Sequence, residues 1–215
     1  MNTRAERLAR LREVDLYPVT CERLSNGRSD FEILDGIIAG GAAMVQLRDK
    51  DADKRTVYKK AEHFRRVTAA HDILLIVNDH VDIALAVDAD GAHLGQDDLP
   101  AGVARGLGPD LIVGVSSHTK AEAEQAECDG ADYVNIGPIF PTQTKDGVGR
   151  GLGVEAIAAN SAGLGIPFTV MGGITRDNLA AVRAAGARTV AVVTAVTRAP
   201  DVAAAVRELR ACLRA

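Results

Sequence analysis

The chain has 215 residues, of which 47% are hydrophobic and 3% aromatic, and its formal net charge at pH 7 is −4. Such a chain can bury one sizeable core of aliphatic side chains, so we expect one domain over residues 1–215, with residues 1–14 as an N-terminal helical extension. The net negative charge, and the lack of any apolar run near the ~20 residues of a membrane span, argue against nucleic acid and membranes as partners.

Eight short apolar runs alternate with longer amphipathic segments along the chain. Several of the runs are almost continuously apolar, which is typical of parallel strands that are covered on both faces. The expected strands are residues 16–20, 44–47, 74–77, 91–94, 111–115, 133–136, 168–170 and 189–193.

Helical patterns fill the intervals between these strands. Residues 29–32 (Ser-Asp-Phe-Glu) and 119–122 (Thr-Lys-Ala-Glu) have the capping-box pattern, in which the first and last side chains satisfy each other's backbone amides. Residues 176–185 and 201–213 are rich in alanine and carry charges on one face, so both are expected to be helices.

Eight strand–helix units in a chain of this length predict a single (β/α)8 TIM barrel. The alternative is an open doubly wound sheet, but no G-x-G-x-x-G pattern follows the first expected strand. In a barrel, functional side chains come from the carboxyl ends of the strands and from the loops that follow them. Polar residues at those positions are therefore the candidates for a site.

The three cysteines, Cys21, Cys128 and Cys212, are far apart and lack a C-x-x-C spacing. They are expected to be free thiols and not a disulfide framework or a zinc site. Free thiols are typical of a reducing compartment, and no apolar signal-peptide core follows the charged N-terminus. Both features favour a cytoplasmic protein.

Basic residues gather at the end of the second expected strand, which reads Gln46-Leu47-Arg48-Asp49-Lys50. Because side chains alternate along a strand, Gln46, Arg48 and Lys50 are expected to face the barrel mouth together. A guanidinium, an ammonium and an amide suit a di- or polyphosphate. The alternative is a salt-bridged strand end in which Asp49 neutralises a neighbour.

Carboxylates follow the third and fourth expected strands, at Asp79 and at Asp97-Asp98. Opposite a basic cluster they suit Mg²⁺, which takes one or two carboxylates and completes its shell with phosphate and water. Aspartate is also a good helix N-cap, so capping is the alternative for each residue on its own.

The loop after the sixth expected strand carries two hydroxyls and an ammonium, at Thr142, Thr144 and Lys145. These groups suit an anionic ligand, and the glycines that follow allow close backbone approach or movement of the loop. A solvated surface loop is the alternative.

A second anion site is expected after the seventh and eighth strands, because these loops of TIM barrels often bind phosphate through backbone amides. Gly173 permits a close approach there, and Thr194, next to Val193, adds a hydroxyl. Two anion sites on one face predict two phosphorylated substrates or one bisphosphate.

Ser116, at the end of the fifth expected strand, is a further candidate for binding a ligand at the mouth. His118 follows it beside a helix start and is expected to be structural. His93 lies inside a short strand and is expected to be buried or to support the site from behind.

Six segments combine these features in one order, namely residues 46–50 (QLRDK), 77–79 (VND), 91–98 (GAHLGQDD), 114–119 (GVSSHT), 132–145 (DYVNIGPIFPTQTK) and 172–175 (GGIT). Together they resemble the thiamine phosphate synthase family, over roughly residues 16–197. The resemblance implies a TIM-barrel transferase of thiamine biosynthesis. Such an enzyme joins 4-amino-2-methyl-5-pyrimidinylmethyl diphosphate to 4-methyl-5-(2-phosphoethyl)thiazole, or to its carboxylated form, and releases diphosphate.

The resemblance also implies a role for each matching position. The pyrimidine diphosphate would be bound by Gln46, Leu47, Arg48, Asp49, Lys50, Asn78, Ser116 and Lys145. The thiazole phosphate would be bound by Thr142, Gln143, Thr144, Gly173, Val193 and Thr194. Asp79 and Asp98 would hold Mg²⁺ as the cofactor, and Arg48, Lys50, Lys145 and Ser116 would take part in catalysis.

Two other functions stay open as alternatives. One is a thiazole tautomerase, a related isomerase that tends to have a histidine in place of Asn78 or Pro138 and lacks the complete Thr-x-Thr-Lys loop. The other is a non-catalytic barrel that binds a phosphorylated ligand. The sequence does not decide the oligomeric state, so a homo-oligomer also stays open.

Overall fold

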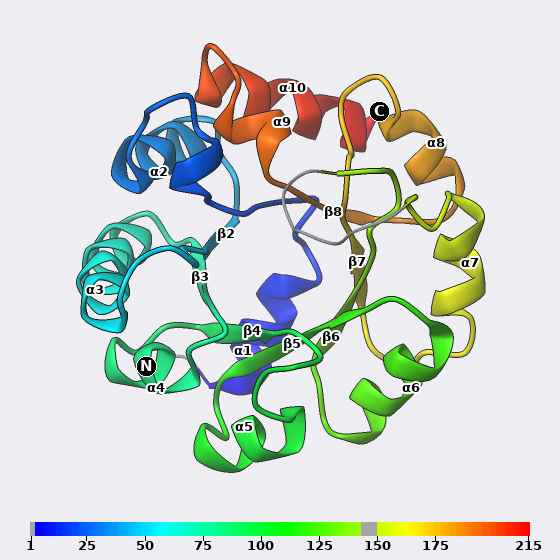
Figure 1. Ribbon diagram of the computed structural model, residues 1–215, viewed down its shortest axis with the longest axis horizontal. Coiled ribbons are helices and arrows are strands. Elements are labelled where there is room, and N and C mark those ends of the chain that lie inside the picture. Colours follow the sequence, from blue (N-terminus) through cyan, green and yellow to red (C-terminus); the bar gives the residue numbers. More distant parts are fainter. Residues whose placement is uncertain (1–2, 143–149) are drawn as a thin grey trace.

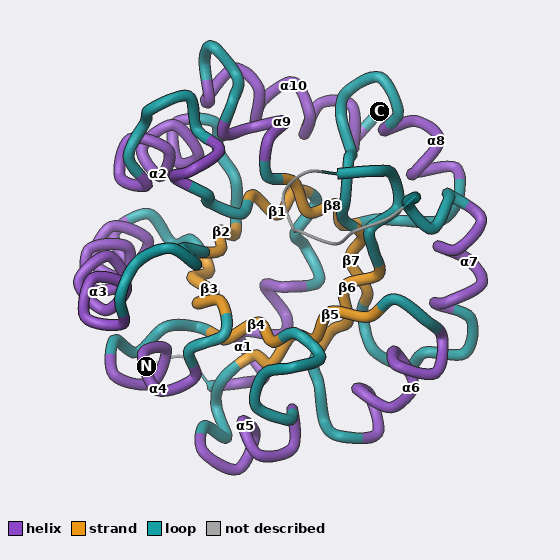
Figure 2. The backbone as a smooth tube through the Cα atoms, viewed as in Figure 1, coloured by secondary structure: helices purple, strands orange, loops and turns teal. Residues whose placement is uncertain are grey.

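The computed structural model describes residues 3–142 and 150–215, and these residues form a ring of eight parallel strands inside a ring of helices (Figure 1). Each strand from β2 to β8 pairs with the next along the chain, and β8 pairs with β1. A bridge between Val19 and Gln46 joins β1 to β2, so the barrel is nearly closed (Figure 2). The predicted TIM barrel is confirmed, and an open doubly wound sheet is excluded.

The strands lie where the apolar runs predict them, with ends that differ by at most two residues. They are β1 (Leu16–Pro18), β2 (Met44–Leu47), β3 (Leu74–Asn78), β4 (Gly91–Leu94), β5 (Ile112–Ser117), β6 (Tyr133–Ile136), β7 (Phe168–Val170) and β8 (Thr189–Val192). Their side chains are buried almost throughout because helices cover the outside and packed side chains fill the inside.

Helices follow the strands and form the outer layer. Before β1 lies α1 (Arg4–Leu11), and after it come η1 (Glu22–Leu24), α2 (Asp30–Ala39), α3 (Lys54–Ala70), α4 (Val81–Ala86), α5 (Ala101–Leu107), α6 (Lys120–Cys128), α7 (Glu155–Ser161), α8 (Leu179–Ala184), α9 (Thr194–Thr197) and α10 (Val202–Arg214). Within the described residues, no helix is both long and apolar enough to cross a membrane.

The two predicted capping boxes have different outcomes. At the start of α2, Ser29 and Glu32 form both reciprocal hydrogen bonds, as predicted. At the start of α6, the Thr119 hydroxyl accepts the Glu122 amide, but the Glu122 carboxylate accepts the backbone amide of His118 instead of that of Thr119. The second half of that prediction is wrong, because the carboxylate also reaches the His118 ring, with its Oε2 3.0 Å from Nδ1.

One helix is shorter than its sequence pattern indicates. Residues 176–185 are expected to be helical, but α8 begins only at Leu179. The Asn178 side chain folds back, accepting the Thr175 amide and donating to the Gly173 carbonyl, each at 2.9 Å. These bonds hold the preceding residues in a turn that competes with the helix.

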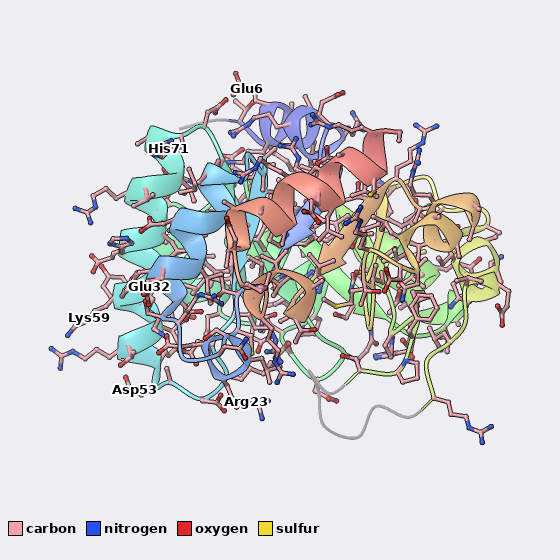
Figure 3. The ribbon with its side chains drawn as sticks, turned by 90° about the horizontal axis from the view of Figure 1, so that it is seen from above. Glu6, Arg23, Glu32, Asp53, Lys59 and His71 are labelled. Atoms are coloured by element: carbon pink, nitrogen blue, oxygen red, sulfur yellow. The ribbon has the colours of Figure 1, made fainter. Side chains whose placement is uncertain are left out.

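The amino-terminal end of the barrel is closed by α1. In Figure 3 this helix, with Glu6, lies at the end of the molecule opposite Arg23 of η1. Leu11 and Val14 pack with the lower layer of side chains inside the barrel, among them Tyr17 and Tyr133. The barrel is therefore open toward a ligand at its carboxyl end, which is the η1 end.

Three buried or half-buried aspartates stand directly before strands at the closed end. Each carboxylate accepts a backbone amide of a strand and also pairs with two arginines from helices. The pairs are Asp15 with Arg210 and Arg214, Asp90 with Arg7 and Arg65, and Asp132 with Arg4 and Arg105. These contacts attach the helical layer to the strands.

Helices α2 and α10 approach closely because Gly36 of α2 and Gly40, which caps its C-terminus, face two valines of α10. A Cβ atom on Gly36 would lie 2.6 Å from the Val202 side chain, and one on Gly40 would lie 2.4 Å from the Val206 side chain. Both distances are far below normal carbon contacts, so the first and last helices of the barrel fit only with glycine here.

We therefore expect Gly36→Ala to lower the free energy of unfolding by about 1–2 kcal/mol, because overpacking outweighs the gain of up to ~1 kcal/mol in helix propensity. Gly106→Ala is the matched control, since a Cβ atom there meets nothing within 4 Å. It should stabilise the protein by about 0.5–1 kcal/mol. Urea unfolding of both variants measures the difference, and equal effects would contradict the close-packing argument.

Candidate active site

A pocket opens at the carboxyl ends of the strands, with an empty volume of about 1090 Å³ that includes open solvent at its mouth. The predicted site residues that line it are Gln46, Arg48, Lys50, Asn78, Asp79, Ser116, Thr142, Gly173, Val193 and Thr194. The barrel thus brings together predicted residues from six strand ends or the loops that follow them.

Other predicted residues do not line the pocket. Leu47 is buried in the core between strands and helices. Asp49 turns to the same side, where its Oδ2 lies 2.6 Å from Nζ of Lys60 on α3, and its Oδ1 accepts the amides of Asp51 and Ala52. Strand alternation explains both positions, since Gln46, Arg48 and Lys50 occupy the inward places. The predictions for Gln143, Thr144 and Lys145 lie outside the described residues.

Arg48 and Lys50 make the β2 side of the pocket positive. The Arg48 amide donates to the Thr20 hydroxyl at 3.2 Å, and its guanidinium contacts the Cys21 thiol, with 3.7 Å between Nη1 and Sγ. Within residues 3–142 and 150–215, the Arg48 guanidinium forms no ion pair. Its charge is therefore available to an anionic ligand.

Asp79 and Asp98 form a carboxylate pair beside these cations. Asp79 has a φ of +63°, which non-glycine residues rarely adopt, and its amide donates to the His93 carbonyl at 2.8 Å. Its Oδ2 lies 3.0 Å from Nζ of Lys50. Burial raises the pKa of Asp79, and the neighbouring Asp98 carboxyl raises it further, although Lys50 lowers it.

This pair fits a divalent cation. Two carboxylates that crowd each other, with a lysine ammonium already against one of them, form an oxygen-rich site that favours positive charge. Asp98 Oδ2 is held at 2.7 Å by the Gly95 amide, so Asp98 belongs to the β4 loop and not to the pocket wall itself.

The opposite side of the pocket is built from backbone and small side chains. Gly172 and Gly173 follow β7 with φ values of +102° and +61°. A Cβ atom on Gly173 would lie 2.6 Å from the Pro141 carbonyl oxygen, so a larger residue would displace the loop that carries Thr142. Val193 and Thr194 complete this side at the start of α9.

Below the mouth, five side chains form a chain of hydrogen bonds across the barrel. The Gln46 amide Nε2 donates to the Tyr17 hydroxyl at 2.6 Å, and the hydroxyls of Tyr17 and Tyr133 are 3.0 Å apart. Nδ1 of His93 lies 3.0 Å from the Tyr133 hydroxyl, and Nε2 lies 2.9 Å from the Ser116 hydroxyl. We call these five residues the polar chain. Both of its ends, Gln46 and Ser116, line the pocket.

Comparison with known proteins identifies what kind of barrel this is. Residues 16–196 match the family model described as thiamine monophosphate synthase. The chain belongs to this family. It is 49% identical to the thiamine-phosphate synthase of Moorella thermoacetica over 197 residues, which are 91% of this chain and 94% of that protein. It is 47% identical to the enzyme of the same name from Chloroflexus aurantiacus, over 91% of each chain.

A solved structure agrees with this assignment. The thiamine phosphate pyrophosphorylase of Pyrococcus furiosus superposes with a TM-score of 0.86 at 38% identity, covering 94% of this chain and 96% of that one. As a member of the thiamine monophosphate synthase family, the protein is a transferase. The tautomerase and the non-catalytic barrel are not favoured.

Several pocket residues of this family member are absent from the sequence-based site. Tyr17, His93, His118 and Asn135 all line the pocket. Asn135 is buried, and its side-chain oxygen accepts the Thr169 hydroxyl at 2.7 Å. Inward-facing polar residues in otherwise apolar strands were the available signal, since a buried polar group needs a partner.

Buried His93 should make the protein sensitive to acid. Burial lowers the pKa of His93 from 6.5 to about 4, with a smaller opposing effect of Asp98 and a lowering effect of Lys50. Between these pH values the unfolded chain binds more protons than the folded one, so stability falls as the pH falls. The free energy of unfolding is expected to fall by about 3 kcal/mol as the pH is lowered from 6.5 to about 4, and this contribution is retained above pH 6.5.

Urea unfolding at several pH values checks this prediction. His93→Gln should remove most of the pH dependence between pH 6.5 and 4, whereas His71→Gln, at the exposed end of α3, should keep it (Figure 3). An unchanged slope in His93→Gln would show that other groups cause the acid sensitivity.

Proposed function

We propose that the protein joins 4-amino-2-methyl-5-pyrimidinylmethyl diphosphate to 4-methyl-5-(2-phosphoethyl)thiazole and releases thiamine phosphate and diphosphate; with the carboxylated form of the thiazole, CO2 is released as well. The observation that carries this proposal is one pocket with two unlike sides. Arg48 and Lys50, with a cation on the aspartate pair, suit a diphosphate, and Gly173 with Thr194 suits a phosphate. The names of the relatives support the same reaction.

The reaction breaks the bond between the pyrimidine methylene carbon and the diphosphate oxygen, and forms a bond from that carbon to the thiazole nitrogen. The electron-rich aminopyrimidine can stabilise positive charge on the methylene carbon. Arg48 and Lys50 then stabilise the negative charge that develops on the departing diphosphate. The walls of the pocket hold the thiazole in line with the carbon, which supplies the advantage of proximity.

Asp79 and Asp98 are proposed to hold Mg²⁺, which would neutralise charge on the diphosphate. Lys145 lies outside the described residues, and its proposed contact with the same diphosphate rests on the match of residues 132–145 to the family. The free thiols Cys21, Cys128 and Cys212 support a cytoplasmic location.

Ser116 and His93 have the spacing of a nucleophile and its base, but they do not suit that role. The low pKa of His93 makes it a weak base, and its other nitrogen contacts the phenol of Tyr133 and not a carboxylate. The proposed displacement needs no protein nucleophile, so Ser116 and His93 are not assigned the roles of nucleophile and base.

The direct test incubates the protein with both substrates and Mg²⁺ and oxidises the product to fluorescent thiochrome. Fluorescence should require both substrates and disappear when Mg²⁺ is chelated with EDTA. Isomerisation of the thiazole substrate without the pyrimidine would indicate a tautomerase instead. Binding of both substrates without product would indicate a non-catalytic barrel.

A further inference from the structure

The polar chain has a direction, which follows from its first bond. The Gln46 side-chain amide donates to the Tyr17 oxygen, and either phenol could donate in the next bond; the arrangement that leaves the buried Tyr17 proton with an acceptor directs it to the Tyr133 oxygen. The Tyr133 proton is then directed to Nδ1 of His93, so a neutral His93 carries its proton on Nε2 and donates it to Ser116. The Ser116 proton is left for the pocket.

Every member of the chain can remain neutral. Burial raises the pKa of Tyr17 and of Tyr133 well above that of an ordinary tyrosine, so both phenols keep their protons. The His93 ring contacts a phenol and a hydroxyl and no carboxylate within the described residues, so the chain contains no charged partner that an imidazolium would need. Each inner hydroxyl or ring therefore donates one hydrogen bond and accepts one, and the chain is fully satisfied.

A glycine makes this chain possible. His93 on β4 and Tyr133 on β6 both pair with Gly114 on β5, so their side chains must meet across that strand. A Cβ atom on Gly114 would lie 2.1 Å from Cζ of Tyr133. The missing side chain leaves room for the phenol to reach the imidazole across β5, which lies between β4 and β6 (Figure 1).

The two ends of the chain present opposite groups to the pocket. In the described part of the chain, the Gln46 amide oxygen accepts no hydrogen bond, so it faces the ligand as an acceptor. Ser116 faces the ligand as a donor. Since the direction of the bonds is continuous, neither end can change without the other.

We propose that the polar chain is a specificity device, in which Tyr17, Tyr133 and His93 position Gln46 as an acceptor and Ser116 as a donor so that the site selects an aminopyrimidine over an oxopyrimidine. An aminopyrimidine offers an exocyclic N–H donor and ring nitrogens that accept. The 4-oxo analogue offers an acceptor where the amine was, so it leaves the Gln46 oxygen facing another oxygen. This inference rests on the proposed function and names the feature of the substrate that is read.

Tyr133→Phe tests the proposal, because Tyr133 does not line the pocket and phenylalanine keeps its ring. The measurement is kcat/KM for the 4-amino pyrimidine diphosphate and for its 4-oxo analogue. The unmodified protein should prefer the amine by at least about 10²-fold. In Tyr133→Phe the preference should fall by about tenfold or more, since the Gln46 amide can then rotate, while the KM for the thiazole phosphate stays unchanged.

Tyr58→Phe is the matched control, because Tyr58 is on α3 and its hydroxyl contacts only Glu62 among the described residues. It should keep the full preference. If Tyr133→Phe loses activity toward both diphosphates equally, Tyr133 has a purely structural role and the proposal is wrong.

A second measurement tests the direction of the chain without activity. Nitrogen-15 NMR of the ligand-free protein should show His93 protonated at Nε2 and not at Nδ1. Protonation at Nδ1 would reverse every bond and overturn the proposal. Product formation with an unchanged preference in Tyr133→Phe contradicts only this inference, whereas no product from the 4-amino substrate in the unmodified protein contradicts the proposed function.

Discussion

Arg48→Ala is expected to lower kcat/KM by about 10²–10³-fold while the protein stays folded. The guanidinium lies at the pocket wall and has no ion-pair partner within the described residues, so its charge is directed to the ligand. Its removal leaves charge on the departing diphosphate less well stabilised. Steady-state formation of thiamine phosphate measures the effect, and circular dichroism checks the fold.

Arg23→Ala is the matched control for this variant. Arg23 lies at the same end of the barrel, where it is half exposed and 3.4 Å from Asp51, but it does not line the pocket (Figure 3). Its removal should change kcat/KM by less than about twofold, since exposed ion pairs contribute little. Near-normal turnover of Arg48→Ala would refute the role given to Arg48.

Asp132→Ala should destabilise the fold by about 3 kcal/mol, and thus lower Tm by on the order of 10 °C. The carboxylate is 1% exposed, pairs with Arg4 and Arg105, and accepts the Val113 amide at 2.8 Å. Removal leaves two cations and one backbone donor without their partner at the closed end of the barrel. Urea unfolding at pH 7 measures the loss.

Because this aspartate lies at the end opposite the pocket, kcat per folded molecule should be unchanged in Asp132→Ala. Asp129→Ala is the control, since Asp129 is exposed and accepts a hydrogen bond from the Gln125 side chain at 2.9 Å. That variant should lose less than about 0.5 kcal/mol. A similar loss in both variants would mean that the buried contacts of Asp132 do not stabilise the fold more than an exposed carboxylate does.

The strands could be predicted from the sequence because each is buried on both faces and reads as a short apolar run. The inward direction of Gln46, Arg48 and Lys50 was also predictable, since alternation along a strand is fixed by backbone geometry. The same alternation argues against Leu47 and Asp49 as pocket residues, which the resemblance to the family had included.

Contacts between distant segments could not be predicted in the same way. Asp49 forms an ion pair with Lys60, and the Glu122 carboxylate accepts the His118 amide instead of the Thr119 amide. Both contacts depend on side-chain conformations that no local sequence pattern encodes. The polar chain depends on the register of five strands, so the link from Gln46 to Ser116 becomes visible only in the barrel. Single-sequence patterns give the elements, whereas register and helix packing decide which polar groups meet.

The close fit of α10 against α2 has a consequence for how the protein is made. The face of α2 that carries Gly36 and Gly40 is covered by valines near the end of the chain, at positions 202 and 206. At roughly 5–20 residues per second, a ribosome needs on the order of ten seconds or more to reach them after α2 has emerged. During that time the face of α2 that α10 will cover stays exposed. A nascent or C-terminally truncated chain is therefore the form most in need of a chaperone.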